Sequence, residues 1–268
     1  MGRGRLPRVA AERRGRPDLP DYLESPEGRR IAYHRSEGSG PGVVFLGGFK
    51  SDMQGTKAVH LEAWARARGR AFLRFDYSGH GESSGAFTEG AIGDWAEDAA
   101  AAITALTEGP QVLVGSSMGG WIALLMCRRL GARVAGLVTI AAAPDFTEDS
   151  MWAGFSEAQR AELAREGRVA LPSDYGEPYI ITRRLIEEGR RQLVLRGPLP
   201  LPFPVRMLQG TADADVSQEV ALRLLAHAEG DDIRLTLVKG ADHRFSAPPQ
   251  LALIEQAVDE VLAALGAA

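Results

Sequence analysis

Cysteine is almost absent from this 268-residue sequence, in which Cys127 is the only one. A single cysteine cannot form a disulfide within the chain, and we expect its thiol to lie in the hydrophobic core. The sequence also has no apolar run of membrane-spanning length and no apolar segment typical of a signal peptide. We therefore expect no stable membrane insertion and a cytoplasmic location.

An excess of positive charge is missing too. The 31 Lys and Arg residues are outnumbered by 35 Asp and Glu residues, for a net charge of −4. This balance argues against nucleic acid as a partner. Residues 1–18 are rich in arginine, and we expect a flexible tail there. An organelle-targeting presequence is less favoured because the segment lacks serine and a clear apolar face.

Apolar strands alternate with helical segments through most of the chain. This alternation is typical of βαβ units and predicts an α/β fold with a mostly parallel, doubly wound sheet. Such sheets carry their sites at the carboxyl ends of the strands. Strands are predicted over residues 22–25, 29–35, 42–46, 71–75, 112–114, 134–141, 205–208 and 233–238, and helices over residues 56–67, 92–106 and 250–265.

The alternation stops at about Pro144 and resumes at Val205. Between them we predict two helical segments, 156–166 and 178–191, followed by a proline-rich stretch. We interpret this segment as a small helical cap over the carboxyl end of the sheet. The predicted divisions are the tail at 1–18, the first part of the core at 19–144, the cap at 145–204 and the second part of the core at 205–268.

The most informative stretch joins the strand at 112–114 to the following helix through Gly115-x-Ser117-x-Gly119. A glycine-rich turn alone would explain the pattern, but its place between strand and helix predicts a nucleophile elbow. Ser117 would occupy a tight turn, and a Cβ at either glycine would collide with a neighbouring strand or helix. The N–H of Met118 would then face a developing oxyanion.

A serine nucleophile needs a base, and two histidines follow it in the chain. His227 lies in a predicted helix, where a structural or exposed role is the better interpretation. His243 lies in a loop between the last strand and the last helix, which is the position expected of the base.

The acid should follow the strand at 205–208, where two carboxylates compete. Asp213 fits the usual spacing better, and Asp215 is the alternative. Asp242, beside the predicted base, is expected to cap its own loop.

A second oxyanion donor should come from the loop after the strand at 42–46. The N–H of Phe49 would serve there together with that of Met118, and a simple Gly-Gly turn with a buried Phe49 is compatible with this role. His80 is interpreted as a turn residue that supports the site. This chemistry requires no metal and no organic cofactor.

These residues lie in a longer pattern. Residues 47–58, 73–79 and 109–121 resemble the α/β-hydrolase superfamily, and within it the branch that contains the mitochondrial acyl-protein thioesterase, also described as an acyl-glucuronide esterase, and its bacterial relatives. The resemblance implies Ser117 as nucleophile, Asp213 as acid and His243 as base. Gln209 and Ser217 depart from the pattern of many relatives, and we expect neither to touch the triad.

We therefore expect a serine hydrolase that cleaves acyl esters or thioesters, with a small-molecule or S-acylated substrate. A non-catalytic binding protein of the same fold, or an acyltransferase or perhydrolase with the same triad, is the alternative. The resemblance also suggests an acyl pocket lined by the cap, although its apolar side chains would equally pack the cap onto the sheet. These are Met151, Trp152, Phe155, Leu163, Leu171, Tyr175, Tyr179, Ile180 and Leu185.

Overall fold

A central sheet organises the computed structural model, which describes residues 19–172 and 178–266. The predicted tail at 1–18 lies outside the described residues. The strands of the sheet are β1 (Asp21–Glu24), β2 (Arg30–Ser36), β3 (Ser39–Leu46), β4 (Arg70–Phe75), β5 (Gln111–Ser116), β6 (Val134–Ile140), β9 (Val205–Gly210) and β10 (Ile233–Val238).

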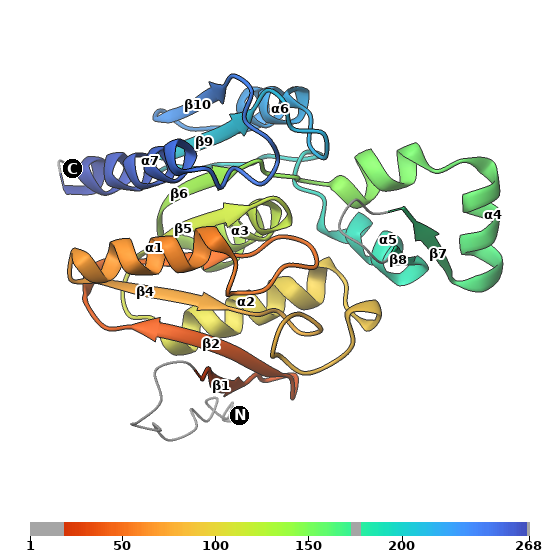
Figure 1. Cartoon of the computed structure of the whole chain (residues 1–268), viewed down its shortest axis with the longest axis horizontal. Coiled ribbons are helices and arrows are strands. Elements are labelled where there is room, and N and C mark those ends of the chain that lie inside the picture. Colours follow the sequence, from red (N-terminus) through yellow and green to blue (C-terminus); the bar gives the residue numbers. More distant parts are fainter. Residues whose placement is uncertain (1–18, 173–177, 267–268) are drawn as a thin grey trace.

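The eight strands follow the order β1-β2-β4-β3-β5-β6-β9-β10 (Figure 1). Only β2 runs against its neighbours within this sheet, and all other adjacent pairs are parallel. The predicted mostly parallel sheet is confirmed. Because parallel strands share one carboxyl edge, the loops after β5, β9 and β10 leave the sheet on the same side.

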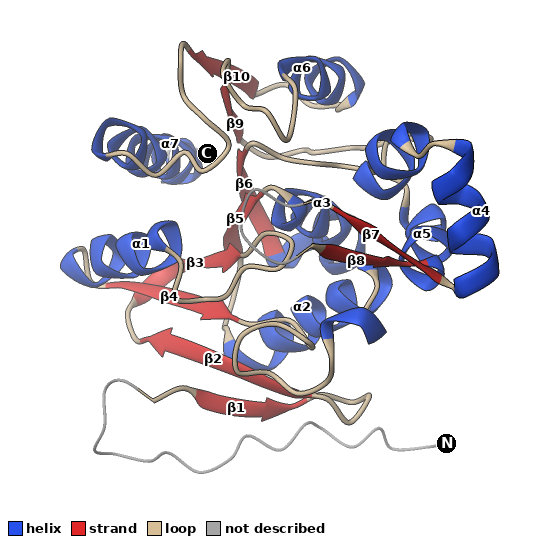
Figure 2. Cartoon of the chain, turned by 45° about the vertical axis from the view of Figure 1, so that its right-hand side comes forward, coloured by secondary structure: helices blue, strands red, loops and turns tan. Residues whose placement is uncertain are grey.

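Helices cover both faces of the sheet, as Figure 2 shows. One face carries α1 (Thr56–Ala67) and α7 (Pro248–Gly266), and the other carries α2 (Ile92–Leu106), α3 (Met118–Leu130) and α6 (Gln218–His227). Side chains of β5 alternate between two cores: Val112 and Val114 pack on the first face and Leu113 on the second. A strand buried on both faces in this way reads as a continuous apolar run.

Cys127 lies on α3 and is buried, as the sequence predicts. Burial raises the pKa of its thiol to about 12, so the group stays a protonated core side chain.

Between β6 and β9 the chain forms a lobe beside the sheet, at the right of Figure 1. It contains the α-helices α4 (Glu157–Glu166) and α5 (Arg183–Gly189), and a π-helix at Thr147–Trp152. The Ser156 hydroxyl caps α4 by accepting from the N–H of Gln159 at 3.2 Å. The helix predicted over 156–166 is therefore present.

The helix predicted over 178–191 is wrong in its first third. Strand β8 (Tyr179–Thr182) pairs antiparallel with β7 (Arg168–Leu171), so the lobe contains a two-stranded sheet and is not purely helical. Aromatic and β-branched residues favour a pleated strand once a partner is present. The helix begins only after Thr182, whose hydroxyl caps it by accepting from the N–H of Leu185 at 3.1 Å.

The two chain segments that connect the lobe to the sheet meet at Asp145. Its fully buried carboxylate accepts hydrogen bonds from the N–H groups of Val194 at 2.7 Å and Leu195 at 3.0 Å, and from the Arg196 guanidinium at 3.2 Å. The segment leaving the sheet is thereby fastened to the segment that returns to it.

Candidate active site

Ser117 occupies the turn between β5 and α3 with φ 55° and ψ −120°. A positive φ is unfavourable for a residue with a side chain and persists only where surrounding contacts hold it. Here the Ser117 N–H donates to the Ile140 carbonyl at 2.9 Å, and its own carbonyl accepts from the Gly120 N–H at 2.9 Å. The strained elbow predicted for Ser117 is what the chain adopts.

The two flanking glycines are required by close backbone approaches. A Cβ on Gly119 would lie 2.1 Å from the Leu46 carbonyl oxygen at the end of β3. A Cβ on Gly115 would lie 2.4 Å from the Gly119 carbonyl oxygen. The elbow can therefore sit against β3 and α3 only because both positions lack a side chain.

His243 lies in the loop between β10 and α7, and its ring joins two other predicted site residues. Its Nε2 is 3.1 Å from the Ser117 hydroxyl, and its Nδ1 is 2.8 Å from a carboxylate oxygen of Asp213. Residues that are 126 and 30 positions from His243 in the sequence thus form one hydrogen-bonded line.

Asp213 is the carboxylate that contacts the imidazole, while Asp215, the alternative, is exposed on the wall of the adjacent cavity. The Asp213 side chain is completely buried, which opposes ionisation. Hydrogen bonds from His243 and from the N–H groups of Asp215 and Val216, at 2.9 and 2.8 Å, outweigh burial and lower the pKa of the Asp213 carboxyl. The group is therefore a carboxylate at neutral pH.

Gln209 contradicts one expectation from the sequence. Its Nε2 donates to the Asp213 carboxylate at 3.0 Å and to the Val216 carbonyl at 2.9 Å, so this departure from the family pattern does touch the predicted triad. Gln209 is the fifth residue of β9 and is fully buried. Its amide ties the end of the strand to the turn that presents Asp213. The second departure, Ser217, is exposed at the start of α6.

The loop after β3 carries the predicted oxyanion donor Phe49. The next residue, Lys50, has φ 58°, and its N–H donates to Nε2 of His80 at 3.2 Å. The other ring nitrogen of His80 lies 3.2 Å from the Ser78 carbonyl, which assigns it as the donor. His80 thus holds the backbone beside Phe49, in agreement with the supporting role expected of it.

Comparison with known proteins identifies the family of this chain. The profile of the alpha/beta hydrolase family matches residues 43–264. The chain belongs to the alpha/beta hydrolase family.

Relatives of this alpha/beta hydrolase are similar over most of its length. The rat protein named palmitoyl-protein thioesterase ABHD10, mitochondrial, is 35% identical over 243 residues, which cover 90% of this chain and 82% of the relative. A crystal structure from Agrobacterium vitis S4 has 40% identity and a TM-score of 0.86, covering 96% of this chain and 99% of the other. The structure of alpha/beta hydrolase domain-containing protein 10 from mouse has 33% sequence identity and a TM-score of 0.85. The match covers 91% of this chain and 98% of the mouse chain. The predicted resemblance to this thioesterase branch is confirmed, and the chain is a hydrolase enzyme.

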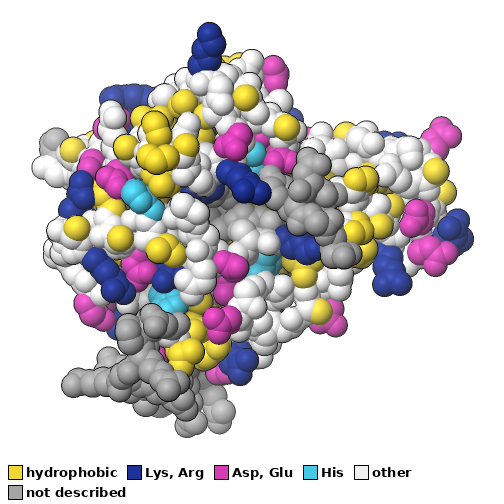
Figure 3. Space-filling model, in the orientation of Figure 1, with side chains coloured by type: hydrophobic (Ala, Val, Ile, Leu, Met, Phe, Trp, Pro, Cys, Tyr) yellow, Lys and Arg dark blue, Asp and Glu magenta, His cyan; other side chains and the backbone are white. Residues whose placement is uncertain are grey.

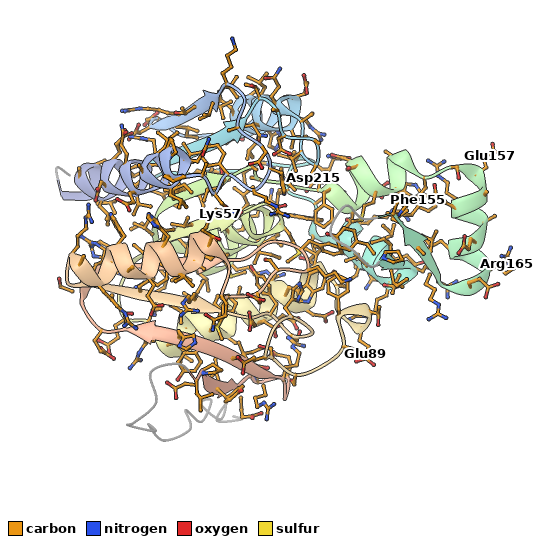
Figure 4. All side chains as sticks on the ribbon, viewed as in Figure 1. Lys57, Glu89, Phe155, Glu157, Arg165 and Asp215 are labelled. Carbon is orange, nitrogen blue, oxygen red and sulfur yellow. The ribbon has the colours of Figure 1, made fainter. Side chains whose placement is uncertain are left out.

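The hydrolase has a cavity of about 560 Å³ at the line of Ser117 and His243. Its wall contains apolar side chains from both the core and the lobe. The larger ones are Phe45, Phe49, Phe146, Met151, Leu171, Pro172, Tyr179 and Val216. Lys57, at the inner end of α1, and Asp215, on the loop after β9, also line it and are labelled in Figure 4.

The apolar side chains predicted for the lobe differ in their surroundings, and Trp152 and Ile180 are half-buried and do not line the cavity. Met151, Leu171 and Tyr179 line the cavity. Phe155, Leu163 and Leu185 are buried within the protein. Tyr175 lies outside the described residues. Cavity lining and burial thus fall to different members of this apolar set, and the acyl pocket stays a prediction.

Two further residues of the hydrolase match their expected structural roles. A ring nitrogen of His227, the last residue of α6, lies 2.9 Å from the Gly197 carbonyl. The Asp242 carboxylate accepts from the N–H of Phe245 at 3.1 Å and so caps its own loop. Within residues 19–172 and 178–266, no helix is both long and apolar enough to cross a membrane.

Protonation of His80 is expected to destabilise the fold at mildly acidic pH. Burial lowers the pKa of this imidazole from 6.5 to about 4. The unfolded chain therefore binds a proton that the native state does not, and stability is lost as the pH falls from 6.5 towards 4. The contribution is on the order of 3 kcal/mol, since one pKa unit corresponds to about 1.4 kcal/mol. Urea unfolding at pH 7.5 and pH 4.5 measures it.

The control for this experiment is His80→Gln, which keeps a hydrogen-bonding group but does not titrate. Its stability should fall less between the two pH values than that of the wild type, because carboxylate titration is common to both proteins. Equal losses in the two proteins would contradict the assignment of a neutral, buried His80.

Proposed function

We propose that this hydrolase cleaves acyl thioesters or esters through a Ser117–His243–Asp213 triad and an acyl-enzyme intermediate. One observation carries the proposal: Ser117 Oγ, the His243 ring and the buried Asp213 carboxylate form a continuous hydrogen-bonded line at the cavity. A serine hydroxyl is a weak nucleophile unless a base takes its proton, and this arrangement supplies that base and its orienting acid.

In the proposed reaction, Ser117 Oγ attacks the acyl carbonyl while Nε2 of His243 takes the hydroxyl proton. Asp213 keeps Nδ1 protonated and stabilises the imidazolium that forms. The N–H groups of Met118 and Phe49 are the proposed donors to the oxyanion. His243 then protonates the leaving alcohol or thiol, and a water molecule, deprotonated by the same imidazole, releases the acid from Ser117.

For the acyl group we propose a hydrophobic chain. The volume of the cavity falls within the range of about 300–1,000 Å³ usual for small-molecule sites. Its apolar wall comes from both the core and the lobe. The similarity to proteins named palmitoyl-protein thioesterase supports a thioester substrate. On the face drawn in Figure 3, acidic and basic side chains of the described residues are interspersed, which favours an acylated substrate over nucleic acid.

A turnover panel on the purified protein tests the substrate class. The substrates are p-nitrophenyl esters of two to sixteen carbons and an S-palmitoyl cysteine peptide, beside acyl glucuronides. We expect kcat/KM to rise with chain length, since each buried methylene contributes about 0.8 kcal/mol, or up to about fourfold per carbon. Equal kcat/KM across chain lengths would refute the hydrophobic acyl pocket. Transfer of the acyl group to added alcohol or peroxide in preference to water would indicate the acyltransferase or perhydrolase alternative.

The cytoplasmic location is still a prediction. Several of the similar mammalian proteins carry the word mitochondrial in their names, and this describes the location of those proteins.

A further inference from the structure

Lys57 occupies an unusual position in the wall of the cavity. The chain contains three lysines, Lys50, Lys57 and Lys239, whereas arginine supplies its other basic side chains. Two of the three, Lys50 and Lys57, line the cavity beside Ser117. Lysine and arginine differ physically, because an ammonium is a compact point charge that loses its proton readily on burial.

Two features make this placement of Lys57 unfavourable for the fold. Lys57 is the second residue of α1, where the helix dipole repels a cation and the first turn has no acidic residue. Burial is the largest influence on its ammonium; together with the positive charge of Arg244 it outweighs Asp242 and lowers the Lys57 pKa from 10.5 to about 8. A residue that opposes local stability in two ways is expected at a functional position.

The contact that Lys57 makes points to such a function. Its Nζ donates a short hydrogen bond to the carbonyl oxygen of Arg244, the residue directly after His243. The Ser246 hydroxyl donates to the same carbonyl at 2.8 Å. Phe245, between them, has φ 49° and is fully buried. The loop that presents His243 is therefore a strained turn fastened to α1 by an ammonium.

We propose that Lys57 is a positioning residue that holds the His243 loop in its reactive geometry by binding the Arg244 carbonyl. This inference rests on the proposed role of His243 as the base. His243 must keep two hydrogen bonds, to Ser117 and Asp213, while its charge changes during the reaction. A displacement of its backbone by a fraction of an ångström weakens both, and Lys57 restricts that displacement from a separate helix.

The anchor is titratable, and this predicts an alkaline decline in activity. Above about pH 8 Lys57 becomes neutral and its hydrogen bond loses the assistance of charge, which is expected to lower kcat about fivefold. Stability responds in the opposite direction: between pH 8 and 10.5 the unfolded chain binds the extra proton, so this group makes stability rise with pH. The titratable and charged groups that share the cavity or loop with Lys57 are Lys50, Asp52, Asp215, Asp242, His243 and Arg244.

The test measures kcat and KM with a p-nitrophenyl ester between pH 6 and 9.5 for four proteins. For Lys57→Met we expect a tenfold lower kcat at pH 7, a KM within twofold of the wild type, and no decline centred near pH 8. Lys57→Arg should recover at least half of kcat and also lack that decline, since arginine stays charged. Lys239→Met, which changes the exposed lysine after β10, should match the wild type throughout.

Thermal unfolding separates positioning from a general loss of structure. Lys57→Met should unfold at the same temperature as the wild type or a higher one, because the partly buried charge is removed. If that variant does not fold, the disappearance of the alkaline decline in Lys57→Arg carries the test. A raised KM with unchanged kcat would assign Lys57 to substrate binding and overturn the proposal, as would wild-type kinetics in Lys57→Met. An active Ser117→Ala would instead overturn the triad itself.

Discussion

Replacement of Ser117 by alanine is expected to abolish turnover while the fold is kept. Removal of the nucleophile in other serine hydrolases lowers kcat by about a millionfold, and the remaining rate comes from binding and oxyanion stabilisation. The alanine also relieves no strain, because φ 55° at this position is imposed by the backbone contacts of the elbow. The measurements are kcat with a p-nitrophenyl ester and covalent labelling by a fluorophosphonate, which reacts with an activated serine.

The matched control is Ser150→Ala, the same substitution at an exposed serine elsewhere on the cavity wall. It should be labelled like the wild type and keep its kcat within about twofold. Persistent labelling of Ser117→Ala would show that another residue is the nucleophile. Absence of labelling and turnover in the wild-type protein would instead favour a non-catalytic binding protein.

Asp213→Asn is expected to have the second-largest effect, a fall in kcat of about ten-thousandfold. The amide is nearly isosteric, so the hydrogen-bonded turn at 213–216 can be retained. However, an asparagine can present its NH₂ to Nδ1 of His243, which favours the tautomer that is protonated at Nε2 and cannot accept the Ser117 proton. The negative charge that stabilises the imidazolium is lost as well. Steady-state kinetics measures the fall in kcat, and a crystal structure of the variant shows whether the turn at 213–216 is retained.

Asp215→Asn is the control, because it makes the same chemical change two residues away in the alternative acid. We expect its kcat to stay within a few-fold of the wild type, since Asp213 is the residue that contacts His243. A larger loss in Asp215→Asn than in Asp213→Asn would reverse the assignment of the acid.

The parts of the site that could be predicted from sequence are those determined by local backbone geometry. A Cβ on Gly115 would meet the backbone of Gly119, and a Cβ on Gly119 would meet the backbone of Leu46. Both glycines stand at a fixed spacing from Ser117, so the sequence alone reveals them. The surrounding sheet is equally predictable from the sequence, because β5 is buried on both faces and therefore forms a short apolar run.

The errors concern contacts that depend on how strands pair and how they end. Nothing local reveals that Tyr179–Thr182 finds a partner strand at Arg168–Leu171, although its aromatic and β-branched residues were a signal for strand. The contact between Gln209 and Asp213 depends on how β9 ends and turns, which the match of residue types to a family pattern does not reveal. The interaction of Lys57 with Arg244 joins residues 187 positions apart and has no signal in the sequence.

The fastening at Asp145 has a consequence for protein engineering. The proposed nucleophile, acid and base all come from loops outside residues 146–193, and the chain enters and leaves that segment at one buried carboxylate. Chimeras with crossover points at Asp145 and at Val194–Arg196 would exchange the part of the cavity wall that the lobe supplies. The proposed nucleophile, acid and base would stay on the loops of the original sheet. Acyl preference and catalytic power could then be altered one at a time.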